Sequence, residues 1–185
     1  MHTPRSLFLI VLCLLLTAST ASAQARSGES ASPPTEALAP FAPFLGLYTF
    51  AGDWEGEPYW GTLEIKPAVK GWYVEWIINV HAVREEDGPL DRQLRMLTTW
   101  DRFAEQYRIW RFETNNPVPM GGGTARFEGD TFIMEWRTPA PDGTMGTFRN
   151  RVLMNGPDEI EIVSEGEKDG GAVEQIGVGT GQRRM

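Results

Sequence analysis

Apolar and polar side chains alternate with a period of two over most of the chain from Leu47 onward. The alternation is clearest at residues 72–80, 94–100, 132–136 and 148–154. This period places successive side chains on opposite faces of a strand, so that one face packs on a core and the other meets solvent. We expect ten strands, at about residues 47–56, 59–66, 71–83, 92–101, 105–113, 123–128, 130–138, 145–155, 158–167 and 172–182.

The segments between these strands are short and contain turn-forming pairs. Asn-Gly and Asp-Gly favour the positive φ angles that tight hairpins need. Pairs of this kind stand at 87–88, 129–130, 142–143, 155–156 and 169–170. No connection is long enough for a crossover helix, so we expect the strands to form an antiparallel meander. A meander of ten strands leaves no unpaired edge strand if its first and last strands pair and close a barrel. The sequence predicts an all-β, ten-stranded, antiparallel up-and-down barrel, with a two-sheet sandwich as the alternative.

The first residues have the pattern of an export signal. Arg5 precedes an apolar run at residues 7–16, and Ala21-Ser22-Ala23 supplies a small-residue cleavage site. We therefore predict a signal peptide at 1–23 and a periplasmic or secreted protein. The apolar run is too short to cross a bilayer, so we expect no stable membrane insertion after cleavage.

A linker and a short plug are expected between the signal and the barrel. Residues 24–40 are rich in small, polar and proline residues, which is typical of a disordered linker. One or two helical turns near its end would bring Phe41 and Phe44 to one end of the barrel as a plug. We assign the barrel domain to residues 41–185.

Composition excludes several classes of function. Cleavage after residue 23 removes Arg5 and Cys13, which leaves 162 residues, no cysteine, and 16 Lys and Arg against 25 Asp and Glu, a formal net charge of −9. Disulfides are therefore excluded, and stability must come from the core. An acidic chain argues against nucleic acid and anionic membrane surfaces as partners.

A family resemblance rests on glycine and tryptophan positions. Gly52-Asp53-Trp54-Glu55-Gly56 looks like the G-x-W-x-G opening of calycin barrels, and Gly71-Trp72 opens a later strand. The chain most resembles the exported DUF1579-type proteins of unknown function, with nitrobindin-like and lipocalin-like barrels more distant. The resemblance implies that a C-terminal basic side chain, Arg183 or Arg184, lies over Trp54. Nitrobindin-like proteins bind haem through a late histidine that this chain lacks, so no cofactor is expected.

Aromatic residues dominate the face that the alternation places inside. Strict alternation also puts Arg108 and Asn150 on that face, and a buried guanidinium needs an acceptor. Apolar walls with a few polar groups are typical of a small-molecule pocket. We expect a small apolar or amphipathic ligand with Arg108 as an anion anchor. The candidate binding residues are Trp76, Trp100, Arg108, Trp110, Trp136 and Asn150.

Other functions remain as alternatives. A packed, ligand-free barrel would serve as a protein-interaction module of the cell envelope, and an isomerase or cyclase using a carboxylate is a third option. His81 is the one histidine left after cleavage, and the alternation puts it on the polar face, so we assign no catalytic or metal-binding residue. The long connection at 114–123 is a candidate rim or lid of the binding site.

Overall fold

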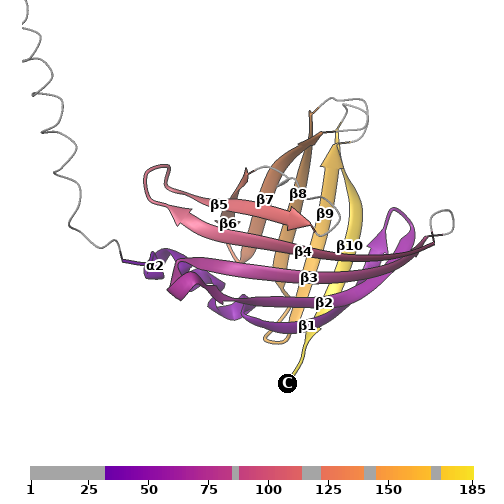
Figure 1. Cartoon of the computed structure of the whole chain (residues 1–185), viewed down its shortest axis with the longest axis horizontal. Helices are drawn as coiled ribbons and strands as arrows, with labels where there is room; N and C mark the ends of the chain where they lie inside the picture. The colour runs from indigo at the N-terminus through magenta and orange to yellow at the C-terminus, as the bar shows by residue number, and fades with distance from the viewer. Residues whose placement is uncertain (1–31, 85–87, 114–121, 140–144, 168–171) are drawn as a thin grey trace, which may run out of the picture. The chain divides into compact units, whose positions relative to one another are not determined.

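A computed structural model describes residues 32–84, 88–113, 122–139, 145–167 and 172–185 (Figure 1). Ten antiparallel strands close into a barrel in the order β1-β10-β9-β8-β7-β6-β5-β4-β3-β2. Because β1 pairs with both β2 and β10, the predicted up-and-down barrel is confirmed and the two-sheet sandwich is excluded. The strands are β1 Gly46–Trp54, β2 Glu57–Ala68, β3 Tyr73–Arg84, β4 Gly88–Asp101, β5 Gln106–Glu113, β6 Gly122–Glu128, β7 Thr131–Pro139, β8 Met145–Met154, β9 Glu159–Glu167 and β10 Val173–Arg183.

The predicted strand positions agree closely with these bounds, and the turn chemistry accounts for the agreement. Gly129 and Gly156 take φ angles of 60° and 105° between consecutive strands, a region that glycine enters without a steric penalty. The predicted turns at 142–143 and 169–170 lie outside the described residues. A short 3-10 helix, η2 (Val69–Gly71), joins β2 to β3.

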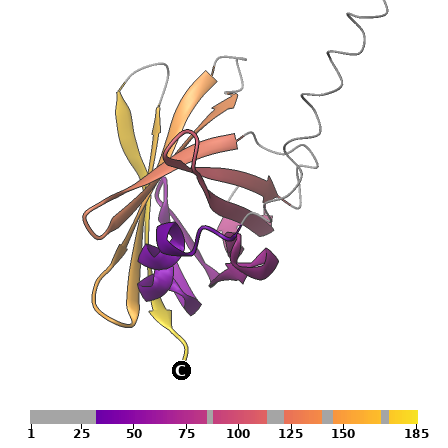
Figure 2. The same ribbon diagram turned by 90° about the vertical axis from the view of Figure 1, so that its left-hand side faces the viewer.

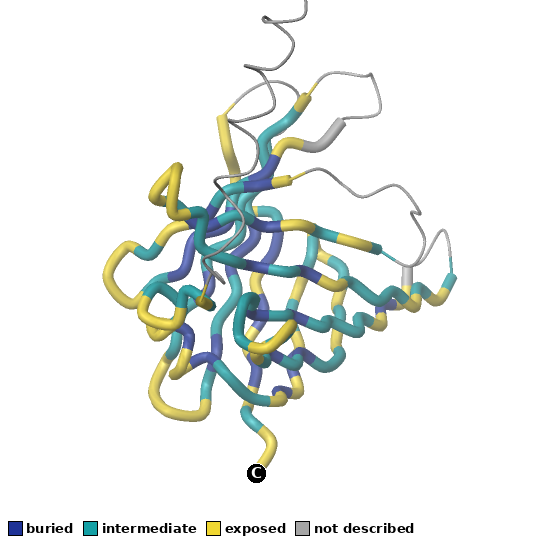
Figure 3. The backbone as a smooth tube through the Cα atoms, turned by 60° about the vertical axis from the view of Figure 1, so that its left-hand side comes forward, coloured by how far each residue is buried: buried dark blue, intermediate teal, exposed yellow. Residues whose placement is uncertain are grey.

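Buried and exposed positions alternate along most strands, as Figure 3 shows. Val74 and Trp76 on β3, Met96 and Thr98 on β4, and Met134 and Trp136 on β7 are buried. These are the positions that the alternation predicts for the interior.

Strand β5 is turned the opposite way from the prediction. Tyr107 and Ile109 are buried, whereas Trp110 is exposed and Arg108 ion-pairs with Asp101, its side chain 41% exposed. Tyr107 lies opposite Trp100 on β4, and directly opposed residues of an antiparallel pair share one face. The expected inward orientation of Arg108 and Trp110 is therefore wrong.

A short N-terminal plug fills one end of the barrel. It consists of α2 (Thr35–Leu38) and the 3-10 helix η1 (Ala39–Phe44), which together lie across the end that faces the viewer in Figure 2. Phe41 makes edge contacts with the rings of Tyr107 and Phe132, at centroid distances of 5.4 and 4.7 Å. The compact unit begins at Pro33, so it includes the last residues of the segment predicted as a linker.

The C-terminal arginine closes the barrel, but not over Trp54. The Cζ atom of Arg183 lies 5.2 Å from the centroid of the Tyr48 ring, and its guanidinium donates to the carbonyl oxygens of Leu45 and Pro43 at 2.6 and 2.7 Å. Tyr48 pairs with Arg183 in the register, whereas Trp54 pairs with Gly177. Six residues of strand, about 20 Å, separate the two positions, so the predicted contact with Trp54 is wrong.

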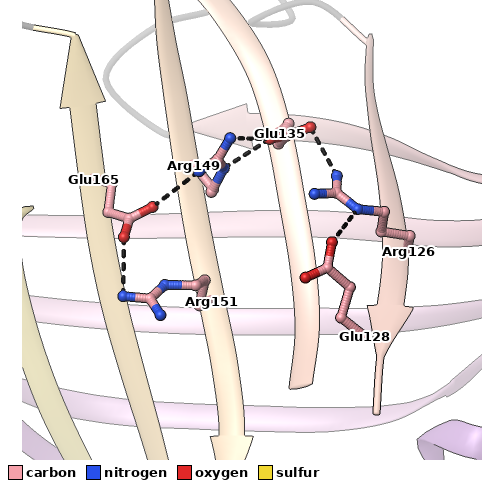
Figure 4. Close-up of polar contacts among 6 residues, drawn as sticks. All are labelled: Arg126, Glu128, Glu135, Arg149, Arg151 and Glu165. Atoms are coloured by element: carbon pink, nitrogen blue, oxygen red, sulfur yellow. Dashed lines mark hydrogen bonds and ion pairs between the residues drawn. The ribbon is translucent and has the colours of Figure 1, made fainter. Parts of the chain in front are cut away.

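Charged side chains form a ladder across the outer faces of β6, β7, β8 and β9. Glu135 lies 2.9 Å from Arg126 and 2.6 Å from Arg149. Opposite charges on neighbouring strands favour their pairing in this register. Figure 4 shows the ladder, which consists of Arg126, Glu128, Glu135, Arg149, Arg151 and Glu165.

Candidate ligand-binding pocket

A pocket of about 270 Å³ opens inside the barrel, away from the plug. Its walls come from the last inward residues of β1, β3, β5 and β9 and the first inward residues of β2, β4 and β8, whereas the plug packs at the opposite strand ends. The aromatic lining residues are Phe50, Trp54, Tyr59 and Phe148. The polar ones are Glu57, Arg92, Arg111, Asn150 and Ser164.

Glycines on β10 leave room for two aromatic side chains next to the barrel wall. A Cβ atom at Gly179 would stand 2.3 Å from the Tyr59 hydroxyl, and one at Gly177 would stand 3.0 Å from the Trp54 ring. Side chains at either position would push these rings into the pocket. The glycines therefore preserve the pocket volume. Burial raises the pKa of the Tyr59 phenol, and the nearby carboxylate of Asp53 raises it further by a smaller amount.

The strongest charges in the pocket belong to a cluster on β4 and β5. Arg111 ion-pairs with Glu113, and Arg92 lies 3.8 Å from the same carboxylate. Only 14% of the Arg111 side chain and 7% of the Glu113 side chain are exposed. Within the described residues, the buried Nε atoms of Arg92 and Arg111 have no hydrogen-bond partner. Two guanidinium groups thus share one carboxylate and retain unused donors.

Aromatic rings surround the Arg111 guanidinium. Its Cζ atom lies 5.4 Å from the Trp136 ring and 6.0 Å from the Phe148 ring, within the range of cation–π contacts. Burial lowers the pKa of Arg111, the Glu113 carboxylate opposes this shift, and nearby Arg92 adds to it. An arginine stays charged in proteins, so the site holds a poorly hydrated cation to which an anion would be attracted.

A second polar site lies on β8 and β9. Asn150 and Ser164 face each other across the two strands, and the Ser164 hydroxyl donates to Asn150 Oδ1 at 2.8 Å. Ser164 is 6% exposed, and both side chains line the pocket. Asn150 is the one predicted binding residue that lines this pocket.

The other predicted binding residues lie elsewhere. Trp76 and Trp100 pack in the plugged half, where the Trp76 ring stacks on Phe132 at a centroid distance of 5.7 Å and Trp100 contacts Tyr107 at 4.9 Å. Trp136 lies behind Arg111 and does not line the pocket. Arg108 and Trp110 are on the outside, as described above.

Sequence reasoning missed Arg92, Arg111, Trp54 and Tyr59 as lining residues. The alternation along β4 could have predicted that Arg92 points into the barrel, because Arg92 lies on the same face as Leu94 and Met96. The turn after β4 has a local marker: Phe103 and Ala104 donate their backbone N–H groups to Asp101 Oδ1 at 3.0 and 3.1 Å, which is typical of hairpin turns. The turn indicates where β5 begins, but the side of β5 that carries Arg111 follows from pairing with β4 and from the plug.

No group of three His, Cys, Asp or Glu side chains that could hold a metal ion occurs in the described part of the chain. His81 lies on the outer face, as predicted, with Nδ1 2.5 Å from Asp91 Oδ1. None of the described helices is long and apolar enough to span a membrane. The loop predicted as a rim or lid lies largely outside the described residues, which end at 113 and resume at 122.

Comparisons relate the chain to known barrels by fold. The sequence matches no protein-family model and no curated protein. A structure of the S-type phycobiliprotein lyase CPES from Guillardia theta has 13% identity, covers 78% of this chain and 90% of that chain, and gives a TM-score of 0.52. Rv2717c from M. tuberculosis has 17% identity, covers 80% of this chain and 98% of that chain, and gives a TM-score of 0.49. The closed ten-stranded barrel is consistent with a calycin-like fold.

Proposed function

We propose that this protein is an exported barrel that binds a small amphipathic molecule in its pocket, with the polar end of the ligand at Arg111. The observation that carries the proposal is a poorly hydrated guanidinium in a pocket of about 270 Å³ with mainly apolar walls. Apolar walls with a few polar groups are typical of small-molecule sites, and this volume suits a ligand smaller than most drugs. Arg111 takes the anchoring role that the sequence assigned to Arg108.

The charges of the pocket favour a small anionic head group over a highly charged ligand. The cluster of Arg92, Arg111 and Glu113 has one more positive than negative charge. Glu57 brings another carboxylate to the pocket from β2, so the four charges sum to zero and the positive charge is local to the two arginines. A single carboxylate on the ligand would use the donors of the two arginines, whereas a polyanion would be repelled by the two glutamates.

Binding is tested with decanoate and its neutral analogue decanol, by calorimetry and by tryptophan fluorescence. We expect decanoate to bind and to quench or shift the emission, because Trp54 lines the pocket and Trp136 contacts Arg111. Arg111→Met should weaken decanoate binding about tenfold or more, since a charge-assisted hydrogen bond is lost, and should leave decanol within about twofold.

Arg108→Met is the matched control, because Arg108 lies on the same strand but on the outer face. It should change neither affinity. Arg92→Met serves as a second test if Arg111→Met alters the thermal unfolding curve. Absence of binding by the wild type, or equal losses in Arg108→Met and Arg111→Met, would overturn the proposal.

A second candidate function is a protein-interaction module, and exposed aromatic side chains on the outer face favour it. Trp110 and Phe112 are 37% and 41% exposed on β5. Native mass spectrometry of protein purified from its own host separates the two functions. A copurified small molecule supports the pocket, whereas a bound protein and an empty pocket support the module.

Export and family membership complete the proposal. The pattern of residues 1–23 supports secretion or a periplasmic location, and the G-x-W-x-G at residues 52–56 supports membership of the DUF1579-type exported proteins. N-terminal sequencing of the protein from its host tests the signal peptide. A mature chain that begins at residue 24 is the expected result, and an intact Met1 would contradict it.

A further inference from the structure

We infer that the ligand carries a second polar group, a carbonyl oxygen that accepts a hydrogen bond from the side-chain amide of Asn150. The ligand class would then be an oxo acid rather than a simple fatty acid. This inference rests on the proposed function, because it adds a second contact to the same pocket.

Hydrogen bonding fixes the way in which the Asn150 amide faces the pocket. The Ser164 hydroxyl donates to Asn150 Oδ1 at 2.8 Å, so the carbonyl end of the amide is occupied. The Nδ2 amino group carries two donors and has no hydrogen-bond partner among the described residues. Oδ1 therefore points to β9, and the amino group is left for an acceptor in the pocket.

Apolar side chains flank Asn150 along β8 and on β7. Met134 lies opposite it on β7, and the next inward residues of β8 on either side are Phe148 and Val152. These neighbours offer no acceptor, so a polar atom of the ligand would supply the one that the amino group needs.

Phe148 places the two polar sites within reach of one small molecule. The Arg111 guanidinium lies 6.0 Å from the Phe148 ring, and Asn150 is the next inward residue on the same strand. An anion at Arg111 and an acceptor at Asn150 would therefore be joined by an apolar segment lying across Phe148. The amide NH₂ group of Asn150 can only donate hydrogen bonds. It therefore favours a ligand with a carbonyl group at this position over one with a methylene group, which would leave the NH₂ group without an acceptor.

The test compares decanoate with a series of keto-decanoates that carry the carbonyl at successive carbons along the chain. Affinities are measured by calorimetry. We expect one keto isomer to bind the wild type about fivefold to tenfold more tightly than decanoate, the value of one hydrogen bond in a partly apolar site. Asn150→Leu should abolish this gain and leave decanoate within about twofold.

Asn79→Leu is the control, because Asn79 lies on the outer face of β3, where it bonds Thr62 and Gln93. It should keep the full gain. Ser164→Ala should reduce the gain, since the amide loses the hydroxyl that holds it, and it provides an independent test if Asn150→Leu unfolds.

The outcomes separate the two proposals. If the wild type binds neither decanoate nor any keto isomer, both proposals fail. If it binds decanoate but no keto isomer more tightly, or if the gain persists in Asn150→Leu, only this inference fails. A gain for the matching hydroxy acids without one for the keto acids would show that the amide presents its oxygen, which also overturns it.

Discussion

Arg111 and Arg108 show how strongly one strand face changes the chemistry of a side chain. Both are arginines of β5, three residues apart. Arg108 bonds Asp101 in a half-exposed ion pair, which contributes little because water screens it. Arg111 is enclosed by Trp136, Phe148 and Glu113, where a charge is poorly hydrated and interacts strongly.

The inner and outer faces of β3 should also differ in how much a side chain contributes to stability, as Trp76 and Tyr73 illustrate. Trp76 is 1% exposed and contacts Phe41 and Phe132, whereas Tyr73 lies on the outer face against Trp110. Trp76→Ala should lower the free energy of unfolding by about 3–5 kcal/mol, as large aromatic truncations in cores do. Tyr73→Ala should cost much less. Urea denaturation measures both, and equal losses would mean that both faces of β3 are buried.

At the scale of elements, side chains from β1, β5 and β10 hold the plug in place. Tyr107 donates its hydroxyl to the Ala37 carbonyl at 2.5 Å, and Tyr48 donates to Phe44 at 3.0 Å. Arg183 adds bonds to Pro43 and Leu45 at the end of η1. These side chains satisfy carbonyl groups that a short helical segment leaves without partners, so a segment too short to be stable alone becomes ordered.

Removal of the Arg183 side chain should therefore loosen the plug. Arg183→Met should lower the free energy of unfolding by about 1–3 kcal/mol, because two hydrogen bonds from a charged donor are lost. Arg184→Met is the matched control, since Arg184 is exposed and its backbone N–H, which the substitution retains, bonds Leu47. Thermal unfolding compares the two. A loss in Arg184→Met as large as that in Arg183→Met would contradict the clamp.

At the scale of the whole molecule, the barrel combines a packed half with a hollow half. Aromatic rings around Phe41 fill the plugged half, and the cross-strand seam of β1 and β10 removes the last open edges. The outer ladder centred on Glu135 joins β6 and β7 to β8 and β9, and β8 and β9 line the pocket. The packed core and the pocket thus lie in different halves of one barrel.

The outer ladder makes the stability of the barrel depend on pH. Burial alone would raise the pKa of Glu135, but hydrogen bonds from Arg149 and Arg126 outweigh it and hold the pKa below its ordinary value of 4.5. The stabilisation is therefore complete above that value and is lost as the pH falls through the lower pKa of the folded state.

Glu135→Gln should thus be less stable than the wild type at pH 7, by up to about 1 kcal/mol. The difference should shrink as the pH falls below 4.5. Glu174→Gln, at an exposed position of β10, is the control and should follow the wild type. Denaturation at several pH values measures the difference, and a gap that stays constant with pH would contradict the role of the ladder.

The sequence by itself determined the strands, the turns between them and the closed meander. These follow from local causes: a period of two in burial and the backbone freedom of glycine at turns such as Gly129 and Gly156. The same alternation placed Asn150 inside the barrel. It also identified Trp76 and Trp136 as interior residues, although not their separation from the pocket.

The tertiary structure alone decided the face of β5, the partner of Arg183 and the position of the hollow half. On β5 either face offers apolar residues, so the period could not choose between Tyr107 with Ile109 and Trp110 with Phe112. The choice came from pairing with β4 and from the plug, which buries Tyr107. Arg183 lies against Tyr48 because the register between the first and last strands pairs these two residues. The first and last strands are far apart in the chain, and no local pattern encodes how they pair.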